Sequence, residues 1–294
     1  MASKPIDVNR LALQIRALTI AGLDPSGGAG ATADLQVMGA HGFAGVVALT
    51  ALTVQSTKGV RRVQPVEAGF LKETLRCLGE DSPPAGVKIG MLATAENAGV
   101  VAEWLRTSGP ARERVVLDPV IRSSSGAELL EPEGVRRLVR ELLPVVGWVT
   151  PNVAELGALL NEPEAGRADV PRLARRLQAL GTPPAVPDEA ETSPPGPNQA
   201  EWGTQGVGGP DGAGLNVVVT GGHLEAPDDY LLLASGEESW FPGKRIEAGG
   251  IHGSHGTGCV FSSALLCRLL LGDTPFAAVT AAKTWVVRRL EGGV

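Results

Sequence analysis

Cysteine is scarce in this chain, which has only Cys77, Cys259 and Cys267 among its 294 residues. Their spacing fits neither a disulfide framework nor a zinc knuckle, which favours a reducing, cytoplasmic setting. Long apolar runs are also missing. The most apolar stretch, residues 42–54, is too short to cross a bilayer, and no apolar core with a cleavage site opens the chain. We therefore expect a cytoplasmic protein with no membrane partner.

An excess of positive charge is absent as well. The chain has 26 Lys+Arg against 32 Asp+Glu, a formal net charge of −6. Such a balance offers no sequence-wide basic field for a phosphate backbone, so we expect no nucleic-acid partner. With 43% hydrophobic residues, the chain is long enough for one large α/β domain or two small ones.

Short apolar runs, mostly β-branched, alternate with stretches of helical spacing such as residues 70–78. The runs cover residues 18–22, 46–54, 87–91, 115–117, 148–150 and 216–220. This alternation predicts an α/β fold with a central, mostly parallel sheet flanked by helices on both faces.

Two segments fall outside this pattern. Residues 182–214 are rich in Pro, Gly and acidic residues and contain no Lys or Arg, which predicts a disordered insertion. Residues 1–14 are interpreted as a flexible leader. The rest of 15–294 is predicted to form a single domain.

Ligands of such sheets bind beyond the carboxyl ends of the strands, so the residues after each strand are the candidates for function. The segment from Asp24 to Gly30 (DPSGGAG) follows the first strand and precedes a helix. Its glycines allow backbone N–H groups to approach an anion, although they would equally suit a simple tight turn. The pattern Gly28-x-Gly30-x-x-Ala33 also fits a loose dinucleotide fingerprint. That reading requires an acidic residue after the second strand, where Gln55 stands instead.

A second glycine-rich turn runs from His255 to Cys259 (HGTGC) and enters a stretch that looks helical. Unpaired N–H groups at a positive helix end can stabilise charge on a phosphoryl group. The same dipole would lower the pKa of the Cys259 thiol and so make it a candidate base. The alternative is an inert, buried cysteine.

Carboxylates and an amide follow two further strands. Asn152 and Glu155 can form a helix capping box, or they can hold phosphate and hydrated magnesium. Asp118 can bind a metal or cap a turn. His223, after the strand at 216–220, is either a packed residue or a nucleotide contact. Met91 is more often a core residue than a ligand.

Seven segments occur in an order that resembles the hydroxymethylpyrimidine/phosphomethylpyrimidine kinases of thiamin synthesis, which have the ribokinase-like fold. They read LTIAG-x-DPSGGAG-x-x-ADL, ALT-x-Q-x-T, KIGML, VLDPV, TPN-x-x-E, GGH and HGTGC. The resemblance runs from about Leu18 to the final helix. It implies ATP-dependent phosphorylation of 4-amino-5-hydroxymethyl-2-methylpyrimidine to its monophosphate and then its diphosphate.

The resemblance also implies roles for residues. It implies that Asp24, Gly28, Ala29 and Gln55 bind the pyrimidine and that Met91 covers its ring. The anion turn consists of Gly256, Thr257 and Gly258, and Cys259 is the base. Asp118 and Glu155 would bind magnesium. The nucleotide would be bound by Asn152, Thr220, Gly222 and His223. ATP, Mg²⁺ and the small pyrimidine are thus the expected ligands.

The chain also departs from the pattern. Relatives carry lysine where Thr220 stands, and Arg122 replaces a lysine near Ser-Gly. Two alternatives therefore stay open: a pyridoxal kinase of the same fold, or a pyrimidine-binding sensor with little catalytic power. A homodimer is possible, to which the apolar strand near Tyr230–Leu233 could contribute.

Overall fold

The computed structural model describes residues 15–56, 59–162, 166–182, 214–222, 224, 226–246 and 255–292. The predicted leader, residues 1–14, lies outside these ranges. So does almost all of the predicted insertion at 182–214.

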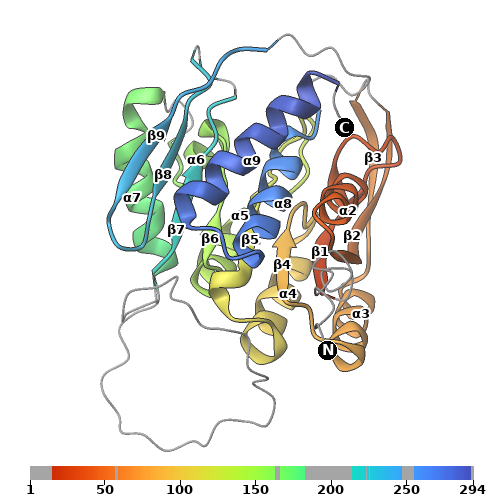
Figure 1. Ribbon diagram of the computed structural model, residues 1–294. Helices are drawn as coiled ribbons and strands as arrows, with labels where there is room; N and C mark the ends of the chain where they lie inside the picture. Colours follow the sequence, from red (N-terminus) through yellow and green to blue (C-terminus); the bar gives the residue numbers. More distant parts are fainter. Residues whose placement is uncertain are drawn as a thin grey trace, which may run out of the picture.

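A nine-stranded sheet, in the order β3-β2-β1-β4-β5-β6-β7-β8-β9, forms the centre of the described chain (Figure 1). The strands are β1 (Arg16–Leu23), β2 (Ala44–Ser56), β3 (Gly59–Pro65), β4 (Gly86–Ile89), β5 (Val115–Leu117), β6 (Trp148–Val149), β7 (Asn216–Val219), β8 (Asp229–Leu232) and β9 (Glu238–Phe241). The six strands from β2 to β7 in this order are parallel, while β3, β8 and β9 pair antiparallel at the edges. Each apolar run singled out in the sequence is one of the parallel strands, so the predicted fold is confirmed.

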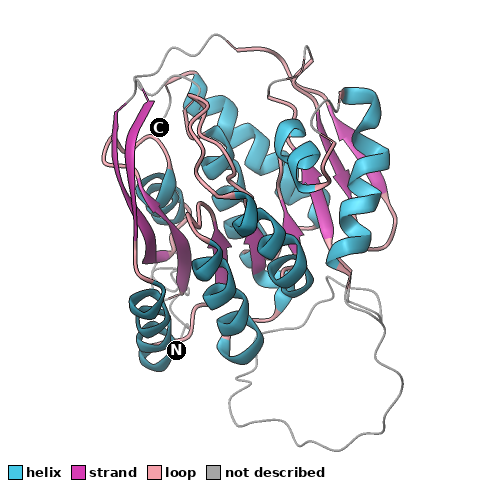
Figure 2. Cartoon of the chain, turned by 180° about the vertical axis from the view of Figure 1, so that it is seen from behind, coloured by secondary structure: helices cyan, strands magenta, loops and turns pink. Residues whose placement is uncertain are grey.

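Helices cover both faces of the sheet. One face carries α2 (Gly30–Ala40), α8 (Thr257–Leu270) and α9 (Pro275–Leu290), which lie in front of the strands in Figure 1. The other face, turned forward in Figure 2, carries α3 (Ala68–Asp81), α4 (Ala95–Ser108), α5 (Pro132–Arg137), α6 (Val153–Leu159) and α7 (Val170–Gly181). Short 3-10 or π turns occupy Arg112–Arg114, Leu138–Leu142, Leu143–Val145 and Arg167–Asp169. The apolar side chains of α8 are buried because this helix lies between the sheet and α9.

The strand order reverses beside β1, which has β2 on one side and β4 on the other. Such a reversal opens a crevice at the carboxyl ends of the strands, since the connecting helices leave toward opposite faces. The parallel strands at this edge are followed by the candidate residues Asp24, Met91, Asp118, Asn152 and Thr220, and Gln55 is the second-last residue of β2.

The suggested contribution of Tyr230–Leu233 to a dimer surface is wrong. Strand β8 is hydrogen-bonded on both sides, to β7 and to β9. Tyr230 is 1% exposed, and its ring lies 4.9 Å from that of Trp240. The apolar run is therefore part of the interior, because the antiparallel strand β9 pairs with the side of β8 that faces away from β7.

Candidate active site

The first glycine-rich loop is held in shape by its own carboxylate. Asp24 accepts hydrogen bonds from the amide and hydroxyl of Ser26, at 2.9 and 2.7 Å, and from the amide of Ala29 at 2.9 Å. Gly30 begins α2 with φ +57°, and a Cβ there would lie 2.3 Å from the carbonyl oxygen of Gly22. The tight-turn reading is confirmed, and the close backbone approach explains the glycine.

The second glycine-rich turn packs directly against the first. Gly256 precedes α8 with φ +77°, and a Cβ on it would lie 2.0 Å from the carbonyl oxygen of Gly28. Arg289 of α9 donates to that same carbonyl at 2.9 Å. The N-cap residue Gly256 has no side chain with which to cap α8, and the first turn of the helix carries no acidic residue. The positive end of the helix thus adjoins the first loop, as an anion site requires.

Replacing Gly256 with alanine is expected to reduce turnover at least tenfold, because the added methyl group must push the two loops apart. The positive φ at this position, which alanine rarely adopts, also lowers the stability of the folded variant by roughly 1–2 kcal/mol. Steady-state kinetics beside a thermal melt measure this effect. Gly236→Ala is a matched control, since that glycine also has positive φ (+87°) but a Cβ on it would meet nothing within 4 Å. Equal turnover losses in both variants would contradict the close-approach argument.

A buried ion pair lies beneath the anion turn. Lys88 of β4 is fully buried, and its Nζ lies 2.9 and 3.0 Å from the carboxylate oxygens of Asp34 in α2. Asp34 also accepts hydrogen bonds from the hydroxyls of Thr19, at 2.6 Å, and Ser263, at 2.8 Å. The Nζ of Lys88 is 4.0 Å from a carboxylate oxygen of Asp118. The network therefore joins β1, β4, α2 and α8 below the site.

Lys88 stays charged in this environment. Burial alone would lower its pKa, but the charges of Asp34 and Asp118 and the hydrogen bond to Asp34 raise it above the ordinary value. The network thus keeps a charged lysine, compensated by Asp34, beneath the turn that precedes α8.

The predicted low pKa of Cys259 is wrong. Burial raises the pKa of this thiol to about 12, and the negative charges of Asp118 and Asp34 act in the same direction. The charge of Lys88 opposes the rise without reversing it. The helix dipole that the sequence suggested is outweighed because the thiol faces two carboxylates and little water. The thiol is neutral in the free protein.

Asp118 and Glu155 form the acidic part of the site. Asp118 accepts a hydrogen bond from the hydroxyl of Ser262 at 3.2 Å, and burial raises its pKa. Burial and the charge of Asp118 raise the pKa of Glu155 to about 8. The capping box is confirmed: the side chain of Asn152 accepts from the Glu155 amide, and Glu155 accepts from the Asn152 amide, both at 2.9 Å.

These two carboxylates fit a magnesium ion. The charge of Asp118 makes ionisation of Glu155 less favourable, so a divalent cation held by these residues would relieve that electrostatic cost. Mg²⁺ usually takes one or two carboxylates and completes its shell with water and phosphate oxygens. Within the described ranges no group of three or more His, Cys, Asp or Glu gathers to hold a metal, so an ion here would depend on water and phosphate oxygens for the rest of its shell.

Glu155→Gln is expected to flatten the pH dependence of stability between about pH 4.5 and 8. The folded-state pKa of Glu155 is raised, so the unfolded chain loses its proton first as the pH rises. The wild type therefore loses stability across that window, while glutamine keeps the hydrogen bond without ionising. Denaturant unfolding at pH 5 and pH 8 gives the comparison, with Glu80→Gln as an exposed control. Parallel slopes in wild type and Glu155→Gln would refute the assignment.

The nucleotide candidates meet at the ends of β6 and β7. The Thr220 amide donates to the carbonyl of Pro151 at 2.9 Å, and Thr220 bridges to Asn152. Gly222 is exposed, with nothing within 4 Å of a Cβ on it. His223 lies outside the described residues, so its predicted nucleotide contact stays a prediction.

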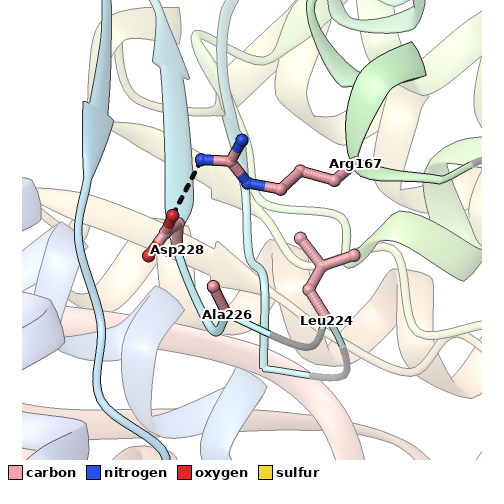
Figure 3. Close-up of a pocket in the computed structure, with 4 residues that line it drawn as sticks. All are labelled: Arg167, Leu224, Ala226 and Asp228. Atoms are coloured by element: carbon pink, nitrogen blue, oxygen red, sulfur yellow. Dashed lines mark hydrogen bonds and ion pairs between the residues drawn. The ribbon is translucent and has the colours of Figure 1, made fainter.

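A shallow cavity of about 620 Å³ lies beside this segment (Figure 3). It is lined by Arg167, Leu224, Ala226 and Asp228, and Arg167 pairs with Asp228 at 2.8 Å. Arg167 also covers the ring of Trp240 at 4.2 Å. Among the predicted site residues that the structure describes, none lines it.

The pyrimidine candidates gather at the ends of β1 and β2. The side chains of Asp24 and Gln55 both contact the imidazole of His255. Met91 is 7% exposed, and its Sδ lies 2.8 Å from where a Cβ on Gly22 would stand. It packs in a small cluster with Ala51 and Leu129. This position is core-like, as expected of methionine, and it borders the first loop.

The comparisons with known proteins agree with this geometry. The family model described as phosphomethylpyrimidine kinase matches residues 24–186 and 212–294. The chain belongs to this family. It is 36% identical to a hydroxymethylpyrimidine/phosphomethylpyrimidine kinase of Aquifex aeolicus, over 94% of each chain.

Solved structures give the same picture of the kinase fold. A phosphomethylpyrimidine kinase from Clostridium difficile 630 matches with a TM-score of 0.71 and 29% identity, over 94% of this chain and 100% of that one. A pyridoxal kinase of Bacillus subtilis, solved as an ADP complex, matches with a TM-score of 0.71 and 26% identity, over 92% and 89%. No helix in the described part of this kinase-family chain is both long and apolar enough to cross a membrane.

Sequence reasoning missed several residues that organise the site of this phosphomethylpyrimidine kinase family member. They are Asp34, Lys88, His255, Ser263 and Arg289. A signal existed for the ion pair, because a lysine inside the apolar strand VKI and an aspartate inside an apolar helix need partners. No local signal marks Arg289, whose role depends on the packing of α9.

Proposed function

We propose that this protein transfers the γ-phosphoryl group of ATP to 4-amino-5-hydroxymethyl-2-methylpyrimidine, and then a second phosphoryl group to the monophosphate, in thiamin synthesis. The observation that carries the proposal is the contact between the two glycine-rich loops, where Gly256 abuts Gly28. It brings the polar side chains of Asp24 and Gln55 and the anion turn close enough to act on one small molecule. Phosphoryl transfer requires mainly such alignment.

The residues divide the work. Asp24 and Gln55, with the backbone of Gly28 and Ala29, bind the pyrimidine, and Met91 borders its ring. The amides at the start of α8 stabilise charge that develops on the transferred phosphoryl group, helped by the positive end of the helix. Lys88, paired with Asp34 and 4.0 Å from Asp118, helps to fix the acidic side of the site from below.

ATP binds across the ends of β6 and β7, at Asn152, Thr220, Gly222 and His223. When bound at Asp118 and Glu155, Mg²⁺ neutralises phosphate charge and orients the phosphates. Thr220 supplies no cation here, so the positive end of α8 bears more of the phosphate charge. Because the reaction consumes ATP and the three cysteines are free, we place it in the cytoplasm.

Cys259 is the proposed proton acceptor of the first transfer. The hydroxymethyl oxygen forms a bond to the γ-phosphorus, the bond to ADP breaks, and the hydroxyl proton moves to the sulfur of Cys259. Since the thiol is neutral in the free protein, the acceptor must be its minor, thiolate form. The second transfer starts from a phosphate anion and needs no such acceptor.

Turnover of the pyrimidine alcohol and of pyridoxal, compared at equal ATP and magnesium, tests the substrate assignment. We expect a kcat/KM for the pyrimidine at least tenfold higher. A preference for pyridoxal would make the protein a pyridoxal kinase. Tight pyrimidine binding without ADP release would make it a sensor, and the departure at Thr220 would then be its cause.

A further inference from the structure

The side chain of His255 lies where three distant segments meet. Its Nε2 is 2.9 Å from Oδ2 of Asp24 and 2.9 Å from the side-chain amide of Gln55. Its Nδ1 is 3.1 Å from the hydroxyl of Ser124, in the loop after β5. The side chain is 17% exposed and that of Asp24 is 4% exposed. The imidazole thus sits largely enclosed between the residues that bind the pyrimidine in the proposed function.

Hydrogen-bond chemistry assigns the proton of this ring. Burial opposes ionisation of Asp24, but hydrogen bonds from Ser26 and His255 hold its pKa below the usual value. An ionised carboxylate only accepts, so Nε2–H must donate to Asp24. As placed, Gln55 turns its amide nitrogen toward Nε2 of His255 and its oxygen toward the Thr53 hydroxyl, 3.2 Å away. A protonated Nε2 cannot accept from that NH₂ group, so we assign the amide the flipped orientation, with its oxygen facing Nε2.

Asp24 and Gln55 therefore act as two acceptors on one N–H of an aromatic ring. An aminopyrimidine presents the same feature, because its exocyclic amino group carries N–H donors at the edge of an aromatic ring. Asp24 is already bonded to Ser26 and Ala29 as well as to His255, so its carboxylate has little capacity left. A pyrimidine and His255 compete for the same oxygens.

We propose that His255 is a positioning residue that occupies the pyrimidine-binding pair in the substrate-free protein and is displaced by the aminopyrimidine edge. This inference rests on the proposed function. His255 directly precedes Gly256, so its displacement also moves the start of the anion turn. Occupancy of the pyrimidine pocket is thereby coupled to the geometry of the phosphoryl site.

Calorimetric titration of the pyrimidine alcohol into wild type and His255→Ala tests the competition. Because the variant has nothing to displace, its Kd is expected to fall by up to about tenfold. Its kcat is expected to fall as well, since the turn is no longer positioned. A residue with a merely structural role would weaken binding and turnover together.

Two further variants complete the design. His255→Gln retains an N–H donor that can reach Asp24, so it should restore a Kd near the wild-type value. His41→Ala is the matched control, because His41 caps the far end of α2 and bonds to the carbonyl of Val37. Its Kd should equal that of wild type.

An unchanged or higher Kd for His255→Ala, in protein whose melting curve shows it folded, overturns the inference while leaving the kinase assignment intact. Absence of pyrimidine binding by wild type itself overturns both. The two failures differ, because only the second appears in the unmodified protein.

Discussion

Lys88→Met is expected to lower the free energy of unfolding by about 3–5 kcal/mol, since it leaves the carboxylate of Asp34 buried without its cation. Lys88 and Asp34 are both 0% exposed, so water cannot take the place of the missing charge. The hydroxyls of Thr19 and Ser263 remain as donors and limit the loss. Chemical denaturation followed by circular dichroism measures it.

Two controls isolate the charge effect. Lys72→Met breaks an exposed pair with Glu103, whose side chains are 62% and 58% exposed, and should cost at most about 1 kcal/mol. Adding Asp34→Asn to Lys88→Met removes both buried charges and should recover much of the stability. If Lys88→Met lost no more stability than Lys72→Met, the buried pair would not be needed to stabilise the packing of α2 and α8.

Cys259→Ala is expected to reduce kcat of the first phosphorylation by roughly 10²–10⁴-fold and that of the second by less than about tenfold. Only the alcohol must lose a proton. The pH profile provides a second check. With a thiol pKa of about 12, the thiolate fraction grows with pH, so kcat/KM of the first step should rise about tenfold per pH unit above neutrality.

Cys267→Ala provides the matched control, because Cys267 lies in the same helix but is fully buried among apolar side chains. It should alter stability without changing the ratio of the two rates. Equal losses of both steps in Cys259→Ala would show that Cys259 shapes the anion turn and is not a base. A plateau of the first-step profile already at pH 7 would lead to the same conclusion.

The parallel sheet could be predicted from the sequence because its strands are buried on both faces and appear as apolar runs. The two edge strands β3 and β9 were not predicted, because their exposed and half-buried residues interrupt the apolar pattern. Because the sequence does not predict β9, the apolar run of β8 suggests a possible dimer surface. Edge strands depend on their neighbours more than on their own composition.

For the site, too, some features could be predicted from the sequence and others could not. Residues at strand ends, such as Asp118 and Asn152, could be predicted because the topology dictates where ligands bind. The pKa of Cys259 could not, because its sign depends on two carboxylates from other elements, Asp34 and Asp118. His255 stood in a quoted motif, yet its contact with Gln55 bridges 200 positions of sequence that only the fold brings together.

The most direct test of the account follows the products of one incubation of the protein with ATP, magnesium and the pyrimidine alcohol, separated by chromatography over time. The account predicts that the monophosphate rises first and then declines as the diphosphate accumulates, with one ADP released per phosphoryl transferred. Absence of both phosphorylated pyrimidines, in folded protein that binds ATP, would contradict it.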